Sequence, residues 1–249
     1  MAFVAKPTNI EPQIIVADTH FVVVEKPHGL PTAPLKADDT NNLVSFIVEK
    51  FPQATTVKGK KAVEYGLLHR LDTETHGLVV MALNQKAYDF LQNEQQNDRF
   101  FKTYTAFCRP ENTNDIHQNT EYLIQSYFRP FGEKGKKVAP VSIAEYNEKP
   151  HIAKKCSPVL YTTHVIKTEP EQEIYCKVSC RITRGFRHQI RAHLAWKHCP
   201  IVSDRLYNEA GIEENVPLQL HASALSFAHP ATGEKVFVSL RDFFTSETR

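Results

Sequence analysis

Residues 67–84 read Leu-Leu-His-Arg-Leu-Asp-Thr-Glu-Thr-His-Gly-Leu-Val-Val-Met-Ala-Leu-Asn. Two apolar segments flank a short polar segment that contains His69, Arg70 and Asp72. A carboxylate between two buried segments is costly to desolvate unless another group pairs with it. The stretch therefore predicts a buried strand at 78–83 and, before it, a functional Asp72 that acts as nucleophile or charge stabiliser. The alternative for this Asp taken alone is a turn cap without chemistry.

The composition indicates a globular protein of a reducing compartment. The chain has 249 residues, of which 41% are hydrophobic, so it can bury a sizeable core. Five cysteines without a Cys-x-x-Cys pair indicate reduced thiols, and Cys176 and Cys180 are expected in core packing. No apolar run approaches membrane-spanning length, which predicts a soluble, cytoplasmic protein without a membrane partner. The net charge of +2 does not by itself announce a nucleic-acid binder.

Many strands with a few interspersed helices are expected, which is typical of an α+β fold with a large, mostly antiparallel sheet. The patterns place strands at 14–16, 21–25, 78–83, 101–107, 122–128, 159–166, 174–182, 218–227 and 236–240. They place helices at 43–51, after an N-cap at Thr40 or Asn41, at 85–91, after an N-cap at Asn84, and at 187–197.

Five segments resemble, in order, the motifs of the RluA-type pseudouridine synthases, the enzymes that isomerise uridine in RNA. The run at 67–84 resembles the motif His-Arg-Leu-Asp-x-x-Thr-Ser-Gly-Leu, except that His76 stands where that family usually has Ser. The other four segments are Lys26-Pro-His-Gly-Leu30, Lys102-Thr-Tyr104, His188-Gln-Ile-Arg191-Ala-His-Leu194 and Leu220-His-Ala222 with His229 and Pro230.

The resemblance implies the pseudouridine-synthase fold, a mixed sheet with flanking helices and a central cleft. It implies an N-terminal extension at 1–11 and a single catalytic domain at 12–249, without a separate N-terminal RNA-binding module. The implied partner is ribosomal or transfer RNA, and a monomer is the default expectation. The reaction breaks the glycosidic bond of a uridine and rejoins the turned uracil through carbon. Because no net redox change or hydrolysis occurs, no cofactor or metal is expected.

The resemblance assigns a catalytic role to three residues. Asp72 corresponds to the catalytic carboxylate, either as nucleophile or as stabiliser of positive character at the sugar. Arg191 is expected to pair with it, because an ionised Asp in a dry cleft needs a neighbouring cation; taken alone, Arg191 would be a solvated helix residue. Tyr104 is expected to stack on the uracil, and its hydroxyl is a candidate for taking the carbon-bound proton. The alternative for Tyr104 is ordinary strand packing.

Further residues are expected to bind the substrate. Arg70 is expected to help displace the target nucleotide, which costs on the order of a few kcal/mol. Ile190 is expected to line the base pocket, although an apolar helix residue is more typical of core. Lys102 is expected to bind the substrate from the face that it shares with Tyr104. His69 is expected to orient the loop through hydrogen bonds.

A basic cluster supplies the expected RNA-binding surface. Between 177 and 203 there are six cations and no Asp or Glu: Lys177, Arg181, Arg184, Arg187, Arg191 and Lys197. A solvated helix face is the alternative. Arg184, Phe186 and Arg187 also depart from the family's Thr-Gly-Arg-Thr pattern, and further along the chain His198 and Ser203 stand where Gly is usual. A second basic loop is expected at 132–137. The spacing of His188, His193 and His198 suits no known zinc pattern, so no zinc site is expected there.

Two other functions remain open. The first is a catalytically weak or inactive relative that binds RNA as a folding or assembly factor, for which the basic surface alone would suffice. The second is a carboxylate-dependent glycoside hydrolase that uses Asp72 and Glu74. Two residues this close in a short loop rarely face each other across a sugar, so the enzyme of the pseudouridine-synthase type is the leading hypothesis.

Overall fold

The computed structural model describes residues 11–34, 36, 38–112, 121–171, 174–213 and 216–240. They form two compact units: the first contains the described residues up to Thr103 and those from His221 onward, and the second is Tyr104–Leu220. The first unit is therefore discontinuous in sequence. The expected extension at 1–11 lies outside the described residues except for Glu11. None of the described helices is long and apolar enough to cross a membrane.

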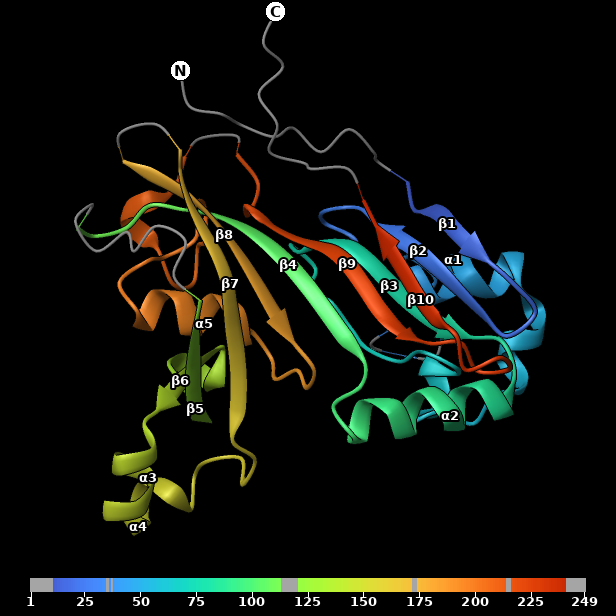
Figure 1. The fold of residues 1–249 in the computed structure, drawn as a ribbon, viewed down its shortest axis with the longest axis horizontal. Helices are drawn as coiled ribbons and strands as arrows, with labels where there is room; N and C mark the ends of the chain where they lie inside the picture. The colour runs from blue at the N-terminus through green and yellow to red at the C-terminus, as the bar shows by residue number, and fades with distance from the viewer. Residues whose placement is uncertain are drawn as a thin grey trace, which may run out of the picture. The chain divides into compact units, whose positions relative to one another are not determined.

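Five of the described strands belong to the first unit, β9 from its second residue onward: β1 (Gln13–Ala17), β2 (Phe21–Lys26), β3 (His76–Ala82), β9 (Leu220–Ala228) and β10 (Lys235–Ser239). Their order is β1-β2-β3-β9, and β10 pairs with β9. The pairing of β3 with β9 is parallel, whereas β1 with β2, β2 with β3, and β9 with β10 are antiparallel. Figure 1 shows β9, coloured red, beside β3, although the two strands are far apart in the sequence. The last strands of the chain thus complete a sheet that the first strands begin.

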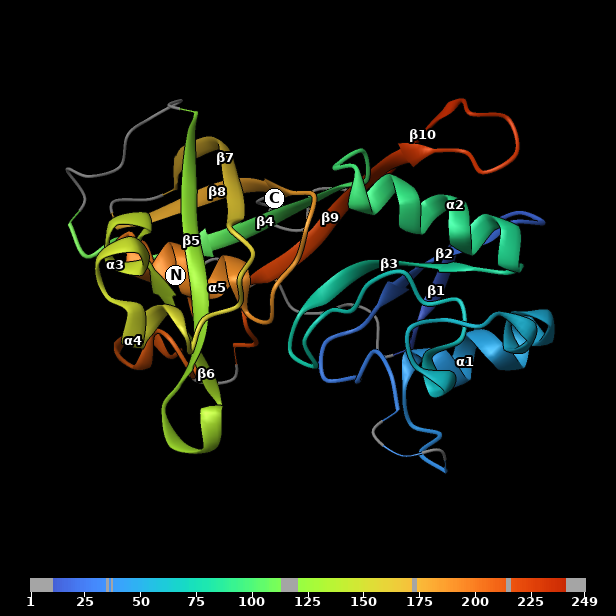
Figure 2. The same ribbon diagram turned by 90° about the horizontal axis from the view of Figure 1, so that it is seen from below.

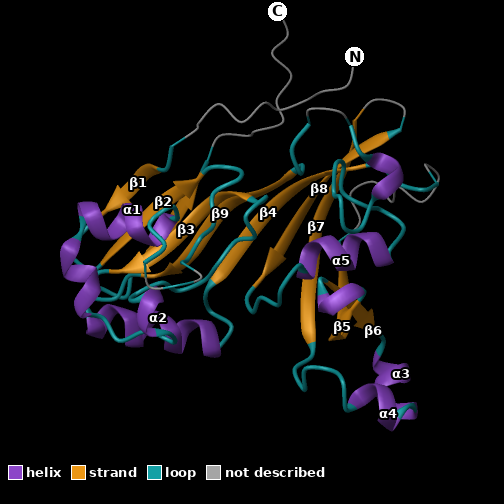
Figure 3. Cartoon of the chain, turned by 180° about the vertical axis from the view of Figure 1, so that it is seen from behind, coloured by secondary structure: helices purple, strands orange, loops and turns teal. Residues whose placement is uncertain are grey.

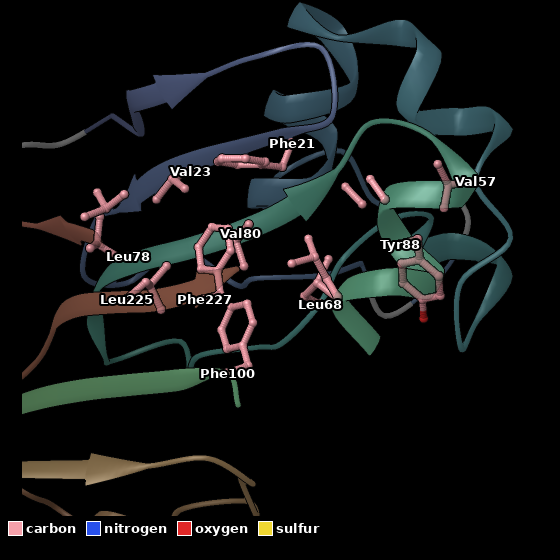
Figure 4. Packing of buried hydrophobic residues seen from close by; sticks show 14 residues of the cluster. Phe21, Val23, Val57, Leu68, Leu78, Val80, Tyr88, Phe100, Leu225 and Phe227 are labelled. Carbon is pink, nitrogen blue, oxygen red and sulfur yellow. The ribbon is translucent and has the colours of Figure 1, made fainter. Parts of the chain in front are cut away.

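Every residue of β3 is buried, because helices cover both faces of this part of the sheet. Figure 2 shows α1 (Leu43–Lys50) and α2 (Gln85–Gln96) on opposite sides of β2 and β3. Figure 4 shows the core on the α2 side, where side chains of β2, β3 and β9 meet Tyr88 and Phe100. Each fully buried Val, Leu or Phe side chain contributes about 1.5–3 kcal/mol to the stability of the fold. This core therefore fixes the position of β3, the strand that follows the loop around Asp72.

Asparagine side chains cap the two α-helices among the described residues of the first unit. The side chain of Asn84 accepts a hydrogen bond from the backbone N–H of Ala87 at 3.0 Å, which confirms the expected cap of α2. The cap of α1 is Asn42, which accepts from Ser45 N at 3.0 Å, so the expected cap at Thr40 or Asn41 is wrong by one or two residues. The next amides, Leu43 N and Val44 N, donate to carbonyls of the preceding loop, and these bonds fix where α1 begins.

The second unit is built on β4 (Phe101–Cys108), β8 (Tyr175–Ile182), β7 (Tyr161–Glu171), β5 (Tyr122–Phe131) and β6 (Lys137–Val141), in that order; the first three residues of β4 belong to the first unit. The helix α5 (Gln189–Trp196) packs against β6 and β7. Two short helices, α3 (Ile143–Glu148) and α4 (Pro150–Ala153), follow β6 (Figure 3).

The sequence patterns missed β6, α3 and α4, and predicted only a basic loop at 132–137. The strand β6 contains Pro140, and proline is compatible with a strand only at a sheet edge. No residue of α3 or α4 is buried, so neither helix has an apolar stripe to detect. The expected class is confirmed: the sheet is large and mixed, and its pairing is mostly antiparallel with flanking helices.

Candidate active site

The loop that contains Asp72 is fastened on one side by a buried lysine. The ammonium of Lys26 donates hydrogen bonds to the carbonyl oxygens of Thr73 at 3.1 Å, Pro27 at 2.9 Å and Leu30 at 2.7 Å. Its side chain is fully buried at the end of β2. Lys26 therefore ties the residue after Asp72 to the proline-containing loop that follows β2.

Two more residues of the same proline-containing loop hold the Asp72 loop. Gly29 donates from its backbone N–H to Thr73 O at 2.9 Å. The hydroxyl of Thr32 donates to Leu71 O at 2.7 Å and accepts from Leu71 N at 3.1 Å. The backbone is thus anchored immediately before and immediately after Asp72. Anchored carbonyls on both sides restrict where this carboxylate can lie.

Lys26 is also the cation that the sequence reasoning missed at this loop. Burial lowers the pKa of Lys26 to about 7, and the negative charge of Asp72 opposes that shift. The two charges are therefore close enough to interact within the first unit. Lys26 was visible in the sequence as part of the Lys-Pro-x-Gly-Leu segment. The spacing of that segment does not indicate that its lysine reaches the Asp72 loop.

His69 and Arg70 point to different surroundings. His69 accepts a hydrogen bond at Nε2 from Val80 N at 3.4 Å, and burial, with a smaller effect of Lys102, lowers its pKa to about 3. A neutral His69 bonded to β3 fits the loop-orienting interpretation. The side chain of Arg70 is 58% exposed, with one nitrogen 3.3 Å from Glu64 Oε1. Arg70 can therefore reach a ligand in solvent, and its nucleotide-displacing role stays a prediction.

Lys102 and Tyr104 are both buried on β4, as their alternation predicts. The Lys102 ammonium lies 5.6 Å from the centre of the Phe100 ring. Burial, with a smaller effect of the Lys60 charge, lowers the pKa of Lys102 to about 8. On α5, Ile190 and Leu194 lie one turn apart and are both buried. The contacts of Tyr104, Lys102 and Ile190 with a uridine stay predictions.

Arg191 has a carboxylate partner that the sequence reasoning did not name. Its Nε and Nη2 donate to the two oxygens of Asp204, at 2.8 and 2.7 Å, and both side chains are at most 2% exposed. Asp204 also accepts from the backbone N–H groups of Leu206 and Tyr207. The Tyr207 ring lies 5.6 Å from the guanidinium of Arg191. Arg191 is therefore held rigidly, and its pairing with Asp72 stays a prediction.

The basic cluster has a smaller surface charge than its sequence window indicated. Arg191 is neutralised by Asp204, which lies one residue beyond the window, and Lys177 is 3.6 Å from Glu169 Oε2. Arg184 and Arg187 are exposed, as expected for residues that bind a phosphate backbone. A guanidinium nitrogen of Arg187 donates to Gly135 O and, at 3.2 Å, to Lys137 O. Arg187 thereby joins the two basic segments, although sequence spacing separates them.

The histidines and cysteines of the second unit fall into separate settings. His193 is buried between the hydroxyls of Ser126 and Thr163, each 2.8 Å from a ring nitrogen. His188 bonds to Tyr207, and His198 bonds to Glu111 at 2.7 Å. The core positions expected for Cys176 and Cys180 are confirmed, since both are fully buried as free thiols.

Known proteins resemble the chain along most of its length. The family model described as RNA pseudouridylate synthase matches residues 20–196. The protein named RNA pseudouridine synthase YlyB of Bacillus subtilis is 26% identical over 93% of this chain and 69% of its own. Ribosomal large subunit pseudouridine synthase D is 26% identical in Neisseria meningitidis, over 95% of this chain, and 25% in Xanthomonas campestris, over 94%. The chain spans only 59% and 67% of the lengths of these two relatives.

Solved structures share the fold. The human RNA pseudouridylate synthase domain containing 1 superimposes with a TM-score of 0.69, over 96% of this chain and 87% of its own, at 22% identity. The human RNA pseudouridylate synthase domain containing 4 gives a TM-score of 0.61 over 93% of this chain and 90% of its own, at 21% identity. The expected pseudouridine-synthase fold is thereby confirmed. On the extent of the family match, the chain belongs to the RNA pseudouridylate synthase family.

Proposed function

We propose that this protein is an RNA pseudouridine synthase that isomerises uridines of ribosomal or transfer RNA, with Asp72 as its catalytic carboxylate. The observation that supports this most is the anchoring of the backbone on both sides of Asp72 by Lys26, Gly29 and Thr32. A reacting carboxylate must be held close to its productive position, because a displacement of about 1 Å can cost about 100-fold in rate. A turn cap without chemistry needs no such anchoring.

The proposed reaction conserves all atoms of the nucleotide. The bond from the sugar carbon to the uracil nitrogen breaks, the uracil turns, and a carbon of the base bonds to the sugar. That carbon then loses its proton, and the freed nitrogen takes up one. Asp72 acts as nucleophile or stabilises positive character at the sugar; both roles need its negative charge. The nearby ammonium of Lys26 stabilises that charge. No cofactor is required, because nothing is oxidised or hydrolysed.

Tyr104 is proposed to stack on the uracil and to take the carbon-bound proton with its hydroxyl. Tyr104→Phe tests the two roles separately, because phenylalanine keeps the ring and removes the hydroxyl. Arg191 is proposed as the cation of the catalytic set. Because Arg191 also neutralises the buried Asp204, activity lost in Arg191→Ala would not separate catalysis from folding. The tyrosine variant is therefore the sharper test of the catalytic set.

RNA binding is proposed at exposed cations of both units. Arg70 is exposed beside the Asp72 loop and would help displace the nucleotide, while Arg184 and Arg187 would contact phosphates. Among the relatives described above, two are named as synthases of the ribosomal large subunit. Ribosomal RNA is therefore the first substrate class to test.

Pseudouridine mapping tests the proposal. Total RNA from cells that lack the gene is compared with RNA from cells complemented by wild type, Asp72→Ala or Glu74→Gln. We expect wild type and Glu74→Gln to restore a specific pseudouridine and Asp72→Ala to fail at equal protein levels. Restoration by Asp72→Ala would remove the carboxylate from the mechanism. Failure of Glu74→Gln would favour a two-carboxylate reaction instead.

The alternative function, RNA binding without catalysis, makes a different prediction in the same experiment. If no pseudouridine changes in ribosomal or transfer RNA while the purified protein still binds RNA in a salt-dependent manner, the protein acts as a binding factor. The basic segments joined by Arg187 would serve either function. The anchoring of Asp72 favours the enzyme, because a binding factor has no use for a fixed carboxylate.

A further inference from the structure

Three potential metal ligands meet in the first unit, on three neighbouring strands. They are Glu25 near the end of β2, His76 at the start of β3, and His221 on β9. One ligand atom of each residue lies within 4.8 Å of the ligand atoms of the other two. His76 Nε2 is 2.9 Å from Glu25 Oε1, and the His76 and His221 rings are stacked with their centres 4.6 Å apart.

The strand register brings the three residues together. His76 and His221 are direct partners in the parallel pairing of β3 with β9. Glu25 is the antiparallel partner of Leu78, two residues from His76, so alternation places Glu25 and His76 on the same face. Lys26, the next residue of β2, points to the other face, where its ammonium binds backbone carbonyls. The lysine charge is therefore directed away from the cluster.

We infer that Glu25, His76 and His221 form a Zn²⁺ site. Two imidazoles and one carboxylate are a ligand set that Zn²⁺ uses in proteins, with room for a fourth ligand. In a tetrahedral zinc site, with metal–ligand bonds of about 2.0–2.2 Å, the ligand atoms lie about 3.4 Å apart. The separations in the cluster, all within 4.8 Å, need to change by little more than an ångström. Zinc binding would replace the contact between His76 Nε2 and Glu25 Oε1 by a bond from each residue to the ion.

Burial favours zinc over other divalent metals. His76 and His221 are 6% and 2% exposed, and the side chain of Glu25 is 13% exposed. Octahedral ions such as Mg²⁺ or Fe²⁺ would need three additional ligands, for which an enclosed cluster has little room. Zn²⁺ needs only one. The stacked rings differ by 15° in orientation, so one imidazole must turn for both to direct a lone pair at the same ion.

The site is independent of the proposed catalytic function, since the isomerisation requires no metal. Zinc would link the end of β2 and the start of β3 to β9. The pairing of β3 with β9 is the parallel contact that completes the sheet of the first unit. Its measurable effect is on metal content and stability. His76 also stands at the position where the family motif usually has Ser. His76→Ser therefore removes one metal ligand and introduces the residue that other family members have there.

Zinc titration of the full-length protein, after removal of metal with a chelator, tests the inference. We expect one Zn²⁺ per chain, a visible tetrahedral spectrum when Co²⁺ replaces it, and a higher midpoint of thermal unfolding. His76→Ser and Glu25→Gln are expected to weaken zinc binding at least 100-fold. His198→Ser, which removes an exposed histidine of the other unit that also bonds to a carboxylate, is expected to bind zinc as wild type does.

The two ligand variants keep the test decisive. Glu25→Gln has the same shape and still offers an oxygen to His76, so it serves if His76→Ser fails to fold. Absence of zinc binding by the wild type would overturn the inference. Zinc binding that is unchanged in a folded ligand variant would also overturn it, since the ion would then lie elsewhere.

Discussion

Replacement of Asp204 by Asn is expected to destabilise the second unit strongly. Asp204 accepts two guanidinium hydrogen bonds from Arg191, at 2.8 and 2.7 Å, and backbone bonds from Leu206 N at 2.9 Å and Tyr207 N at 3.1 Å. The two backbone bonds end on Oδ1, which an asparagine oxygen can replace. The asparagine amide would then face the Nε–H donor of Arg191, and the charge of Asp204 that balances the buried guanidinium would be lost.

The magnitude follows from the burial of the pair. Removal of one partner from a buried ion pair costs about 3–5 kcal/mol, because the other charge is left in a poorly solvating environment. The side chains of Arg191 and Asp204 are 2% and 0% exposed, so the full effect is expected. For a chain of 150–250 residues, each kcal/mol lowers the midpoint of thermal unfolding by about 2–4 °C. The expected decrease is therefore about 6–20 °C.

The single tryptophan provides a local measurement. Trp196 lies on α5, the helix that also contains Arg191, so its fluorescence during urea unfolding reports on the second unit. The control is Glu145→Gln, which breaks the exposed pair of Glu145 with Lys149 and is expected to cost about 0.3–0.5 kcal/mol. A loss of less than about 1 kcal/mol in Asp204→Asn would refute the idea that this buried pair holds the second unit together.

Three further outcomes are expected. Gly77→Ala is expected to lower the free energy of unfolding in urea more than Gly29→Ala, because an added Cβ at Gly77 would lie 2.4 Å from Ala222 O, whereas nothing lies within 4 Å at Gly29; equal losses would contradict this. Burial lowers the pKa of Lys26 to about 7 from 10.5 in the unfolded chain, so the unfolded chain binds more protons between these values and stability rises with pH. Wild type is therefore expected to gain stability relative to Lys26→Met between pH 7 and 9, by at most about 1.4 kcal/mol per pH unit, and a difference that does not vary with pH would contradict it. Arg184→Ala is expected to reduce the salt dependence of RNA binding by about one phosphate contact, measured as the slope of log K against log salt, while an unchanged slope would place Arg184 outside the interface.

Local patterns predicted the elements that have an apolar face. The strand at 78–83 and the cap at Asn84 follow from residues close in sequence, and the structure has β3 and α2 there. The same patterns failed for β6, whose Pro140 and basic start obscure a strand. They also gave no sign of Asp204 as the partner of Arg191, since a turn rather than a periodic element brings the two together. Burial of charge depends on such long-range pairing, which periodicity does not report.

Two departures from the family pattern have a conformational explanation. His198 and Ser203 stand where the family usually has Gly, and their φ angles are +57° and +59°. This left-handed region costs about 1–2 kcal/mol for residues with a side chain. Backbone geometry explains the usual glycine without reference to RNA.

The discontinuity of the first unit has a consequence during translation. The nascent chain leaves this unit at Thr103 and returns to it only at His221, where β9 pairs with β3. At roughly 5–20 residues per second, the ribosome delivers that strand roughly 6–24 s later. During this interval the apolar edge of β3 has no parallel neighbour and is exposed to other chains. The second unit has by then been synthesised in full. If translation stopped before β9, the first unit, which contains Asp72, would be the aggregation-prone part of the nascent protein.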